Sequence, residues 1–284
     1  MREPAKRGGI ILAQHARVEH VHAVAGLFSA LPRRKRPRRE VAYDVSDVET
    51  WRFREFEALG ADDQTVFLTI LAMIAQSRQS LGADEATRVL ALRGESRVRQ
   101  SLYLVTSARR LASECGWPPR WRLIQQSLTR LSSTTFDIVV GGVTRSAGAL
   151  LARLVRDDGQ LVITINPHLA RVLLDPDHTL WARVDLDERR QLTTDTARVL
   201  HAWLCAWLRP GQSGSVQVTT LVSHVWPDEG APPAGTVKFR HHAVREALHQ
   251  IGSLAGWSIG APNAHGAMRV SRAGDVHTRQ SGAG

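Results

Sequence analysis

The sequence predicts an α+β protein made of two tandem winged-helix units, each a helix-turn-helix followed by a β-hairpin wing. Two observations support this fold class. The order helix, strand, helix, helix and hairpin can be traced twice along the 284 residues, and each third helix carries a stripe of basic or amide side chains. We expect the first unit at residues 41–177 and the second at 178–273. A flexible basic arm is expected at 1–40 and a disordered tail at 274–284.

The charge of the chain indicates an acidic partner. Lys and Arg total 37 against 27 Asp and Glu, a formal net charge of +10. Such a balance favours nucleic acid, and a membrane surface is the weaker alternative. No apolar run approaches the roughly 18 residues that span a bilayer. The apolar stretch in the start MREPAKRGGIILAQH is too short for a signal peptide. We therefore expect a cytoplasmic protein without a membrane partner.

The expected arm ends in the run PRRKRPRR, in which prolines alone interrupt the charges. Such a segment has no apolar side chains to bury in a core and is typical of a flexible basic tail. An arginine that neutralises a phosphate releases condensed counterions, so a DNA-binding arm is favoured over a merely solubilising one. The cations of this run are Arg33, Arg34, Lys35, Arg36, Arg38 and Arg39.

Two helices are expected to open the first unit. LGADDQTVFLTILAMIAQ has Asp62 and Asp63 before its apolar positions, where carboxylates cap the helix and favour its dipole. A catalytic carboxylate pair is the alternative interpretation. After the strand-like SLYLV, the segment TSARRLASECG predicts a helix capped by Thr106 or Ser107 and closed by Gly116.

The third helix of the first unit is the expected DNA reader. PPRWRLIQQSLTRLSS opens on two prolines and places Trp121, Ile124, Leu128 and Leu131 on one apolar face. Its free edge offers Arg and Gln, which match guanine and adenine bidentately in the major groove. The expected DNA-binding side chains of this helix are Arg120, Arg122, Gln125, Gln126, Thr129 and Arg130.

The first unit is expected to end in a hairpin wing and a short helix. TTFDIVVGG and ALLARLVRDDGQLVITI alternate like strands around turn signals. In NPHLARVLL, Asn166 is expected to cap a helix that starts at Pro167.

The same order returns in the second unit. TTDTARVLHAWLCAWLRPG predicts a helix, SVQV a strand, TTLVSHVWP a short helix, and GWSIGAPNAHGAMRVSR a hairpin. Between them, VKFRHHAVREALHQIGSLAGWSI has an apolar helix face and a second stripe that also includes His249. An ordinary solvated basic face is the alternative for this stripe. The expected DNA-binding side chains here are Lys238, Arg240, His241, His242 and Arg245.

The cysteines and the N-terminal histidines are the candidate reactive groups of the chain. Cys115 and Cys205 lie in apolar helical patterns, so we expect buried free thiols and no metal site. The run HVH contains His20 and His22 in the His-hydrophobe-His motif that metal-dependent DNA-nicking initiators use. Such an enzyme also needs a tyrosine in a helix, whereas the two tyrosines of this chain sit in strand-like contexts.

Several segments resemble the RepC replication initiators of IncQ-type plasmids. GLFSAL, LGADD, ARVLHAWLCAWLRPG, TLVSHVWP, VREAL and GWSI are similar to landmarks of that family, in the same order. The resemblance implies two winged-helix domains that bind directly repeated origin sequences (iterons) in double-stranded DNA. It implies opening of the adjacent DNA for a plasmid-encoded helicase and primase, and neither a catalytic site nor a cofactor. Copies bound to neighbouring repeats are expected to associate side by side.

Carried over by residue, the resemblance places the family's basic recognition helix on Lys238, Arg240, His241, His242 and Arg245, and its first reading helix on Arg122 to Arg130. The family segment is denser in Arg and Lys than this chain, which has Phe239 and two histidines there. Residues 76–99 match poorly and receive no role. A transcriptional regulator of the same fold and a nicking initiator using His20 and His22 are the alternative functions.

Overall fold

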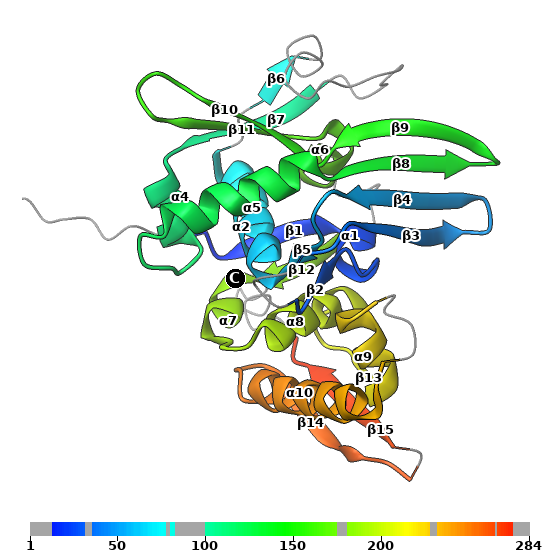
Figure 1. Ribbon diagram of the computed structural model, residues 1–284. Helices are drawn as coiled ribbons and strands as arrows, with labels where there is room; N and C mark the ends of the chain where they lie inside the picture. The colour runs from blue at the N-terminus through cyan, green and yellow to red at the C-terminus, as the bar shows by residue number, and fades with distance from the viewer. Residues whose placement is uncertain are drawn as a thin grey trace, which may run out of the picture.

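A computed structural model describes residues 13–31, 36–77, 80–82, 100–174, 181–227, 232–264 and 266–274. Helices and several small sheets are interspersed along these residues, so the protein is of mixed α+β class (Figure 1). The expected tail lies outside the described residues except for Gly274. No helix in the described ranges combines the length and the apolar character needed to cross a bilayer.

Residues 13–31 are part of the folded core, which corrects the expectation of a flexible arm over residues 1–40. Strand β1 (His15–Glu19) pairs antiparallel with β12 (Trp181–Asp185) and leads into the short helix α1 (His20–Val24). Strand β2 (Phe28–Ser29) pairs in parallel with β5 (Leu59–Gly60). Because β1 pairs with a strand that follows residue 177, the expected boundary between the two units is bridged by a sheet.

A four-stranded antiparallel sheet follows, in the order β3–β4–β8–β9. Its two hairpins lie side by side and extend away from the helices (Figure 1). Gly141 and Gly142 form the turn between β8 and β9 with φ of 56° and 79°, the left-handed pair that a two-residue hairpin requires. The strands are β3 (Arg39–Ser46), β4 (Glu49–Glu55), β8 (Thr135–Val140) and β9 (Val143–Ala149).

After the unexpected α1, the described helices α2, α4, α5 and α6 form where the sequence predicts them. In α4 (Ala108–Glu114), the Ser107 hydroxyl accepts the N–H of Arg110 at 3.1 Å, so the expected cap is confirmed. The Asn166 side chain likewise accepts the N–H of His168 at 2.9 Å and caps α6. The other helices are α2 (Ala61–Ser77) and α5 (Trp121–Ser133), with α6 at Pro167–Leu174.

The region expected to form one wing contains two hairpins. The first, β8–β9, belongs to the four-stranded sheet already described, and the second, β10–β11, joins a different sheet. In that sheet β11 pairs antiparallel with β7, the strand that precedes α4. Its strands are β10 (Leu151–Val155), β11 (Leu161–Ile165), β7 (Gln100–Thr106) and β6 (Ser80–Gly82).

The C-terminal half repeats this connection. Strand β13 precedes α9 and pairs antiparallel with β15, the second strand of the last hairpin, in a sheet of order β13–β15–β14. Buried residues from both halves form one continuous core. The elements are α7 (Leu186–Gln191), α8 (Asp195–Trp207), β13 (Ser213–Gln217), α9 (Val218–Val225), α10 (Ala234–Gly252), β14 (Trp257–Pro262) and β15 (Ala267–Arg272).

Candidate nucleic-acid interface

Helix α5 presents a polar edge to solvent. Ile124, Leu128 and Leu131 are completely buried, and burying each side chain contributes about 1.5–3 kcal/mol to folding. This burial fixes the rotation of the helix, so that its opposite edge faces outward. The exposed side chains on and next to that edge are those predicted at Arg120, Arg122, Gln125, Gln126 and Thr129.

A cation from the neighbouring hairpin extends this edge. Nη2 of Arg153, on β10, donates to Oγ1 of Thr129 at 2.9 Å, and its Nη1 lies 3.4 Å from the carbonyl oxygen of Gln125. The Arg153 side chain is exposed. Helical spacing within α5 could not identify Arg153, because the residue reaches the helix from a strand that is distant in sequence.

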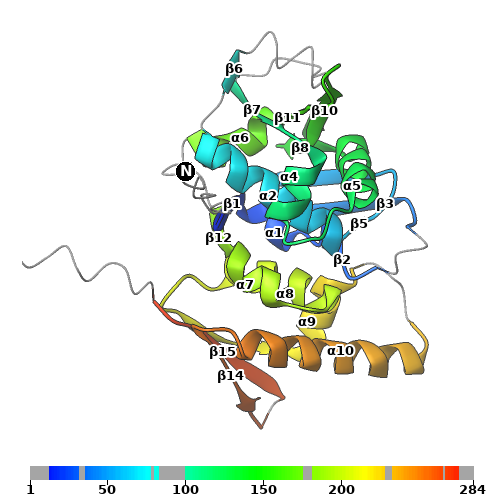
Figure 2. The ribbon, with the colours of Figure 1, turned by 90° about the vertical axis from the view of Figure 1, so that its left-hand side faces the viewer.

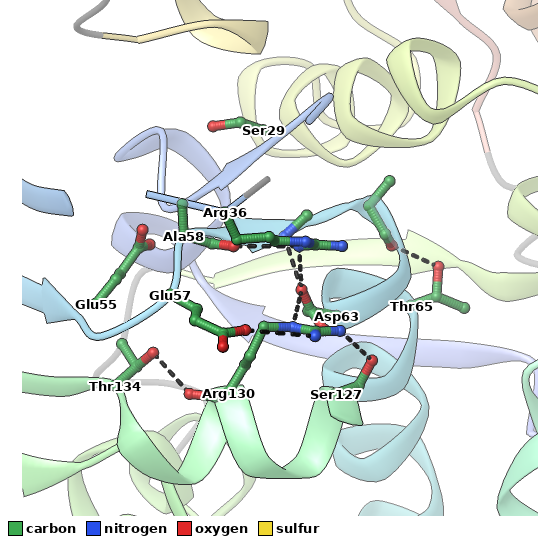
Figure 3. A network of polar contacts seen from close by, with 12 residues as sticks. Ser29, Arg36, Glu55, Glu57, Ala58, Asp63, Thr65, Ser127, Arg130 and Thr134 are labelled. Atoms are coloured by element: carbon green, nitrogen blue, oxygen red, sulfur yellow. Dashed lines mark hydrogen bonds and ion pairs between the residues drawn. The ribbon is translucent and has the colours of Figure 1, made fainter. Parts of the chain in front are cut away.

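Arg130 lies inside the protein, and its assignment to DNA is therefore corrected. Its side chain is buried, with 8% of the residue exposed. Nε and Nη2 of Arg130 lie 3.0 and 2.8 Å from Oδ1 of Asp63, which is itself completely buried (Figure 3). The reason is its position on the helix, since Arg130 follows buried Ser127 by three residues and faces α2.

Asp63 serves as a structural anion at the start of α2. Its Oδ2 accepts the backbone N–H of Gly60 at 2.8 Å, which supports the capping interpretation. The same oxygen pairs with Nη1 of Arg36 at 2.7 Å (Figure 3). Two guanidinium groups thus share one buried carboxylate, and Asp63 is enclosed by contacts within the protein.

The basic run that leads into β3 contains two arginines, Arg36 and Arg39, that bind other groups of the protein. Arg36 donates to Asp63 and to the carbonyl oxygen of Ala58, and Arg39 forms a bidentate pair with Glu55 at 2.8 and 3.0 Å. These two arginines bind the protein itself, so Arg36 is not the free DNA-binding cation that was expected. The expected DNA-binding residues Arg33, Arg34 and Lys35 lie outside the described residues.

Helix α10 carries the second exposed face. Val244, Leu248 and Ile251 are completely buried and orient the helix. His241 is half-buried beside the exposed stripe. The exposed side chains of the opposite face are Lys238, Phe239, His242, Arg245, Glu246 and His249.

Arg240 is the second assignment to be corrected. Only 8% of the residue is exposed, and its guanidinium lies 5.3 Å from the centre of the Trp226 ring. Arg240 precedes buried Val244 by four residues and buried Ala247 by seven, so it occupies the inner face of α10. This spacing was readable from the sequence and predicts an inward side chain.

Each exposed face also carries an aromatic ring that is open to solvent. Trp121, at the start of α5, is 57% exposed, although the sequence pattern placed it on the apolar face. The helix begins at this residue, so its ring projects beyond the part of α5 that packs on α2. On α10, Phe239 is 64% exposed.

Helix α5 and the N-terminal end of α10 lie on one side of the molecule (Figures 1 and 2). In Figure 1, α5 passes in front of α2 and α10 passes in front of β14. In Figure 2, α5 and the N-terminal end of α10 both lie at the right. One extended partner on that side can therefore meet both helices.

Comparison with known families identifies the chain. The family model for Replication protein C (RepC) matches residues 12–273. The chain belongs to the RepC family. This membership confirms the resemblance drawn from GLFSAL, LGADD and the other segments, and it places the protein among replication proteins.

The fold of this RepC-family protein also has a solved counterpart. It is similar to the crystal structure of domains 2 and 3 of RctB, with a TM-score of 0.55 and 12% sequence identity. The similarity covers 90% of this chain and 98% of the RctB chain, and at this identity it supports the fold alone. No curated protein sequence matches the chain.

The residues of the nicking alternative do not form the arrangement that it requires. His20 and His22 lie on α1 rather than on a central strand, and Tyr43 and Tyr103 lie in strands β3 and β7. His22 is enclosed by aromatic rings, with Trp51 at 5.4 Å between ring centres. Burial, and secondly the charge of His168, lowers the pKa of His22 to about 3. His22 is therefore a core histidine in this RepC-family protein.

Proposed function

We propose that this RepC-family protein initiates plasmid replication by binding directly repeated origin sequences through two winged-helix units. The observation that carries the proposal is the pair of exposed helix faces on α5 and α10. Helix α5 and the N-terminal end of α10 lie on one side of the molecule (Figures 1 and 2). A net charge of +10 favours the same partner, double-stranded DNA.

The strand connections support treating both halves as winged helices. In each half a strand, β7 or β13, leads into a helix, α4 or α9, and pairs with the last strand of a later hairpin, β10–β11 or β14–β15. In the first half the hairpin β8–β9 lies between α5 and β10. The third helices of these two series are α5 and α10, which are the elements that such a fold inserts into the major groove. The hairpins β10–β11 and β14–β15 take the place of the wings.

The proposed division of labour follows from side-chain chemistry. Arg122 and Gln125 offer bidentate hydrogen bonds to base edges, while Lys238 and Arg245 neutralise phosphates or contact guanine. The exposed ring of Phe239 suits apolar contact with a thymine methyl group. Tethering makes binding of the second helix intramolecular, so two weak readers give tight binding to a repeat about two helical turns long.

Initiation would follow from the bound array. Several copies on tandem repeats bend or wrap the DNA, and the deformation cost of a few kcal/mol per site is offset by protein contacts. Strain of this kind favours opening of an adjacent AT-rich tract, where a plasmid-encoded helicase and primase enter. The proposed role is DNA binding and remodelling without a catalytic step or a cofactor.

Footprinting on DNA of the replicon that encodes the protein tests this function. We expect protection of tandem repeats beside an AT-rich tract, together with permanganate-reactive thymines in that tract at saturating protein. DNA with scrambled repeats is the matched control and should remain unprotected. Protection of a single promoter palindrome would instead establish the transcriptional regulator.

A further inference from the structure

Three potential metal ligands meet where α7 packs on α8. Nε2 of His201 lies 2.8 Å from Oε2 of Glu188 and 3.7 Å from Sγ of Cys205. The three ligand atoms all lie within 4.8 Å of one another, and both His201 and Cys205 are buried. This arrangement joins one nitrogen, one sulfur and one oxygen ligand at a single point.

Cys205 has a histidine at ligand spacing in the sequence, which the interpretation of both cysteines as isolated buried thiols did not take into account. In the run HAWLC, His201 precedes Cys205 by four residues, which places both side chains on the same face of α8. The third group, Glu188, lies on α7, and Asp185 caps that helix by accepting the N–H groups of Asp187 and Glu188. Only the packing of α7 on α8 shows that Glu188 meets the other two.

The geometry argues against a nucleophilic catalytic triad. In a triad the cysteine and the carboxylate contact different nitrogens of the histidine ring. Here both contact Nε2, and Nδ1 of His201 has no hydrogen-bond partner among the described residues. Nε2 of His201 lies next to both the Glu188 carboxylate and the Cys205 thiol. A metal ion between these three groups would contact all of them.

We propose that Glu188, His201 and Cys205 bind a divalent transition-metal ion of the Zn²⁺ class. Zn²⁺ takes thiolate, imidazole and carboxylate ligands at about 2.0–2.3 Å, so its tetrahedral ligand atoms lie roughly 3.3–3.8 Å apart. The observed separation of Nε2 from Sγ, 3.7 Å, is already in that range. The contact between Nε2 and Oε2 needs to lengthen by only about 0.5 Å.

Charge balance is maintained when the ion binds. Metal binding removes the proton of the Cys205 thiol and the Nε2 proton of a doubly protonated His201, whose ring keeps its other proton on Nδ1 and is then a neutral ligand. The remaining thiolate and carboxylate then neutralise the two positive charges of the ion. The Glu188 side chain is 20% exposed, which provides an entry route and room for water as a fourth ligand.

A neighbouring tryptophan supports the proposed site from the C-terminal hairpin. Nε1 of Trp257, on β14, donates to Oε2 of Glu188 at 2.9 Å and fixes the carboxylate, as outer contacts of metal ligands do. Arg272 lies 5.2 Å from the centre of the Trp257 ring and donates to the Cys205 carbonyl oxygen at 3.4 Å. A bound ion would thus tie α7 to α8 and, through Trp257, to β14.

Cobalt substitution tests the proposal directly. The full-length protein is freed of metal with a chelator and titrated with Co²⁺, whose thiolate charge-transfer and d–d absorption report on the ligands. We expect one ion per chain, absorption typical of a tetrahedral thiolate site, and displacement of cobalt by Zn²⁺. Cys205→Ser should abolish the thiolate band. Cys115→Ser is the matched control, since that buried thiol contacts Oγ1 of Thr69 and should leave the band unchanged.

A second variant keeps the test decisive if Cys205→Ser folds poorly. Glu188→Gln retains a side chain of the same shape but removes the anionic ligand, so Co²⁺ affinity should fall at least tenfold. Added Zn²⁺ should raise the melting temperature of the native protein and of Cys115→Ser more than that of Glu188→Gln. The proposal is overturned if the native protein binds no stoichiometric Co²⁺, or if the thiolate band persists in Cys205→Ser.

Discussion

Arg130 on α5 and Asp63 on α2 form a buried ion pair in which two guanidinium nitrogens face one carboxylate oxygen at 2.8 and 3.0 Å. Arg36 approaches the other oxygen of Asp63 at 2.7 Å. The carboxylate therefore holds α5 against α2 from within, while the edge with Arg122 and Gln125 remains free. The ion pair positions the proposed reading helix without contacting DNA.

Asp63→Asn should lower the free energy of unfolding by about 3–5 kcal/mol, because two guanidinium groups in a buried site lose their shared anion and Arg130 keeps only the longer contact with Glu57, at 3.7 Å. Urea denaturation followed by circular dichroism measures the loss. Asp47→Asn, in the exposed turn between β3 and β4, is the matched control and should change little. Equal stability of the two variants would show that the ion pair does not hold α5 in place.

Arg122→Ala and Gln125→Ala should each weaken binding to the cognate repeat by about 1–3 kcal/mol and binding to random DNA much less, because base-edge contacts are lost. Fluorescence anisotropy on both DNAs measures the difference. Arg52→Ala removes an exposed cation on β4, away from both helices, and serves as the control. Equal losses on both DNAs would reduce Arg122 and Gln125 to phosphate contacts.

Replacing Arg33, Arg34 and Lys35 together by Gln should reduce the slope of log K against log salt concentration by up to about 2.7, since each phosphate contact contributes about 0.9. Preference for the repeat should be unchanged. Arg36→Gln is the contrasting variant, because its side chain binds Asp63, and it should lower stability rather than the slope. An unchanged slope in the triple variant would support a solubilising role for these three residues.

Because His22 is buried in its neutral form, the free energy of unfolding should decrease as the pH falls. Its pKa is about 3 in the folded protein, below the ordinary value of 6.5, so the unfolded chain binds the additional proton between these limits. Stability should therefore fall as pH decreases from about 6.5 towards 3, by at most about 1.4 kcal/mol per pH unit.

The nearby carboxyl group of Glu19 has the opposite effect on stability. Mainly through burial, its pKa is raised to about 7, which favours the folded state as pH falls from 7 towards 4.5. Comparing the native protein with His22→Phe isolates the histidine, because Glu19 is present in both. Urea midpoints at several pH values should show the native protein losing stability relative to the variant. A difference that stays constant with pH would contradict the assigned pKa of His22.

Much of the fold could be predicted from local signals. Caps were expected at Thr106 or Ser107 and at Asn166, and Ser107 and Asn166 accept the predicted type of hydrogen bond. The edge of α5 was also predicted, because one fully buried face determines which residues point outward. These features depend on neighbours within a few residues along the chain.

The inward side of Arg240 and the spacing of His201 and Cys205 could have been read from the sequence, whereas the other missed features depend on distant partners. Strand β1 (His15–Glu19) pairs with β12 (Trp181–Asp185), which is far away in the sequence, so local signals assigned residues 13–31 to an arm. Arg130 turns inward because Asp63, on another helix, accepts its charge. Glu188 likewise joins His201 and Cys205 only through helix packing. Periodicity assigns a residue to a face of its own helix, but it does not say which other element covers that face.

Hydroxyl-radical footprinting of one origin repeat tests the central claim, that α5 and α10 read the same DNA. The native protein should protect two segments about one helical turn apart. Arg122→Ala should weaken protection of one segment and Arg245→Ala protection of the other, with the remaining segment still visible at higher protein concentration. A single protected segment, or loss of the same segment in both variants, would contradict the two-reader account.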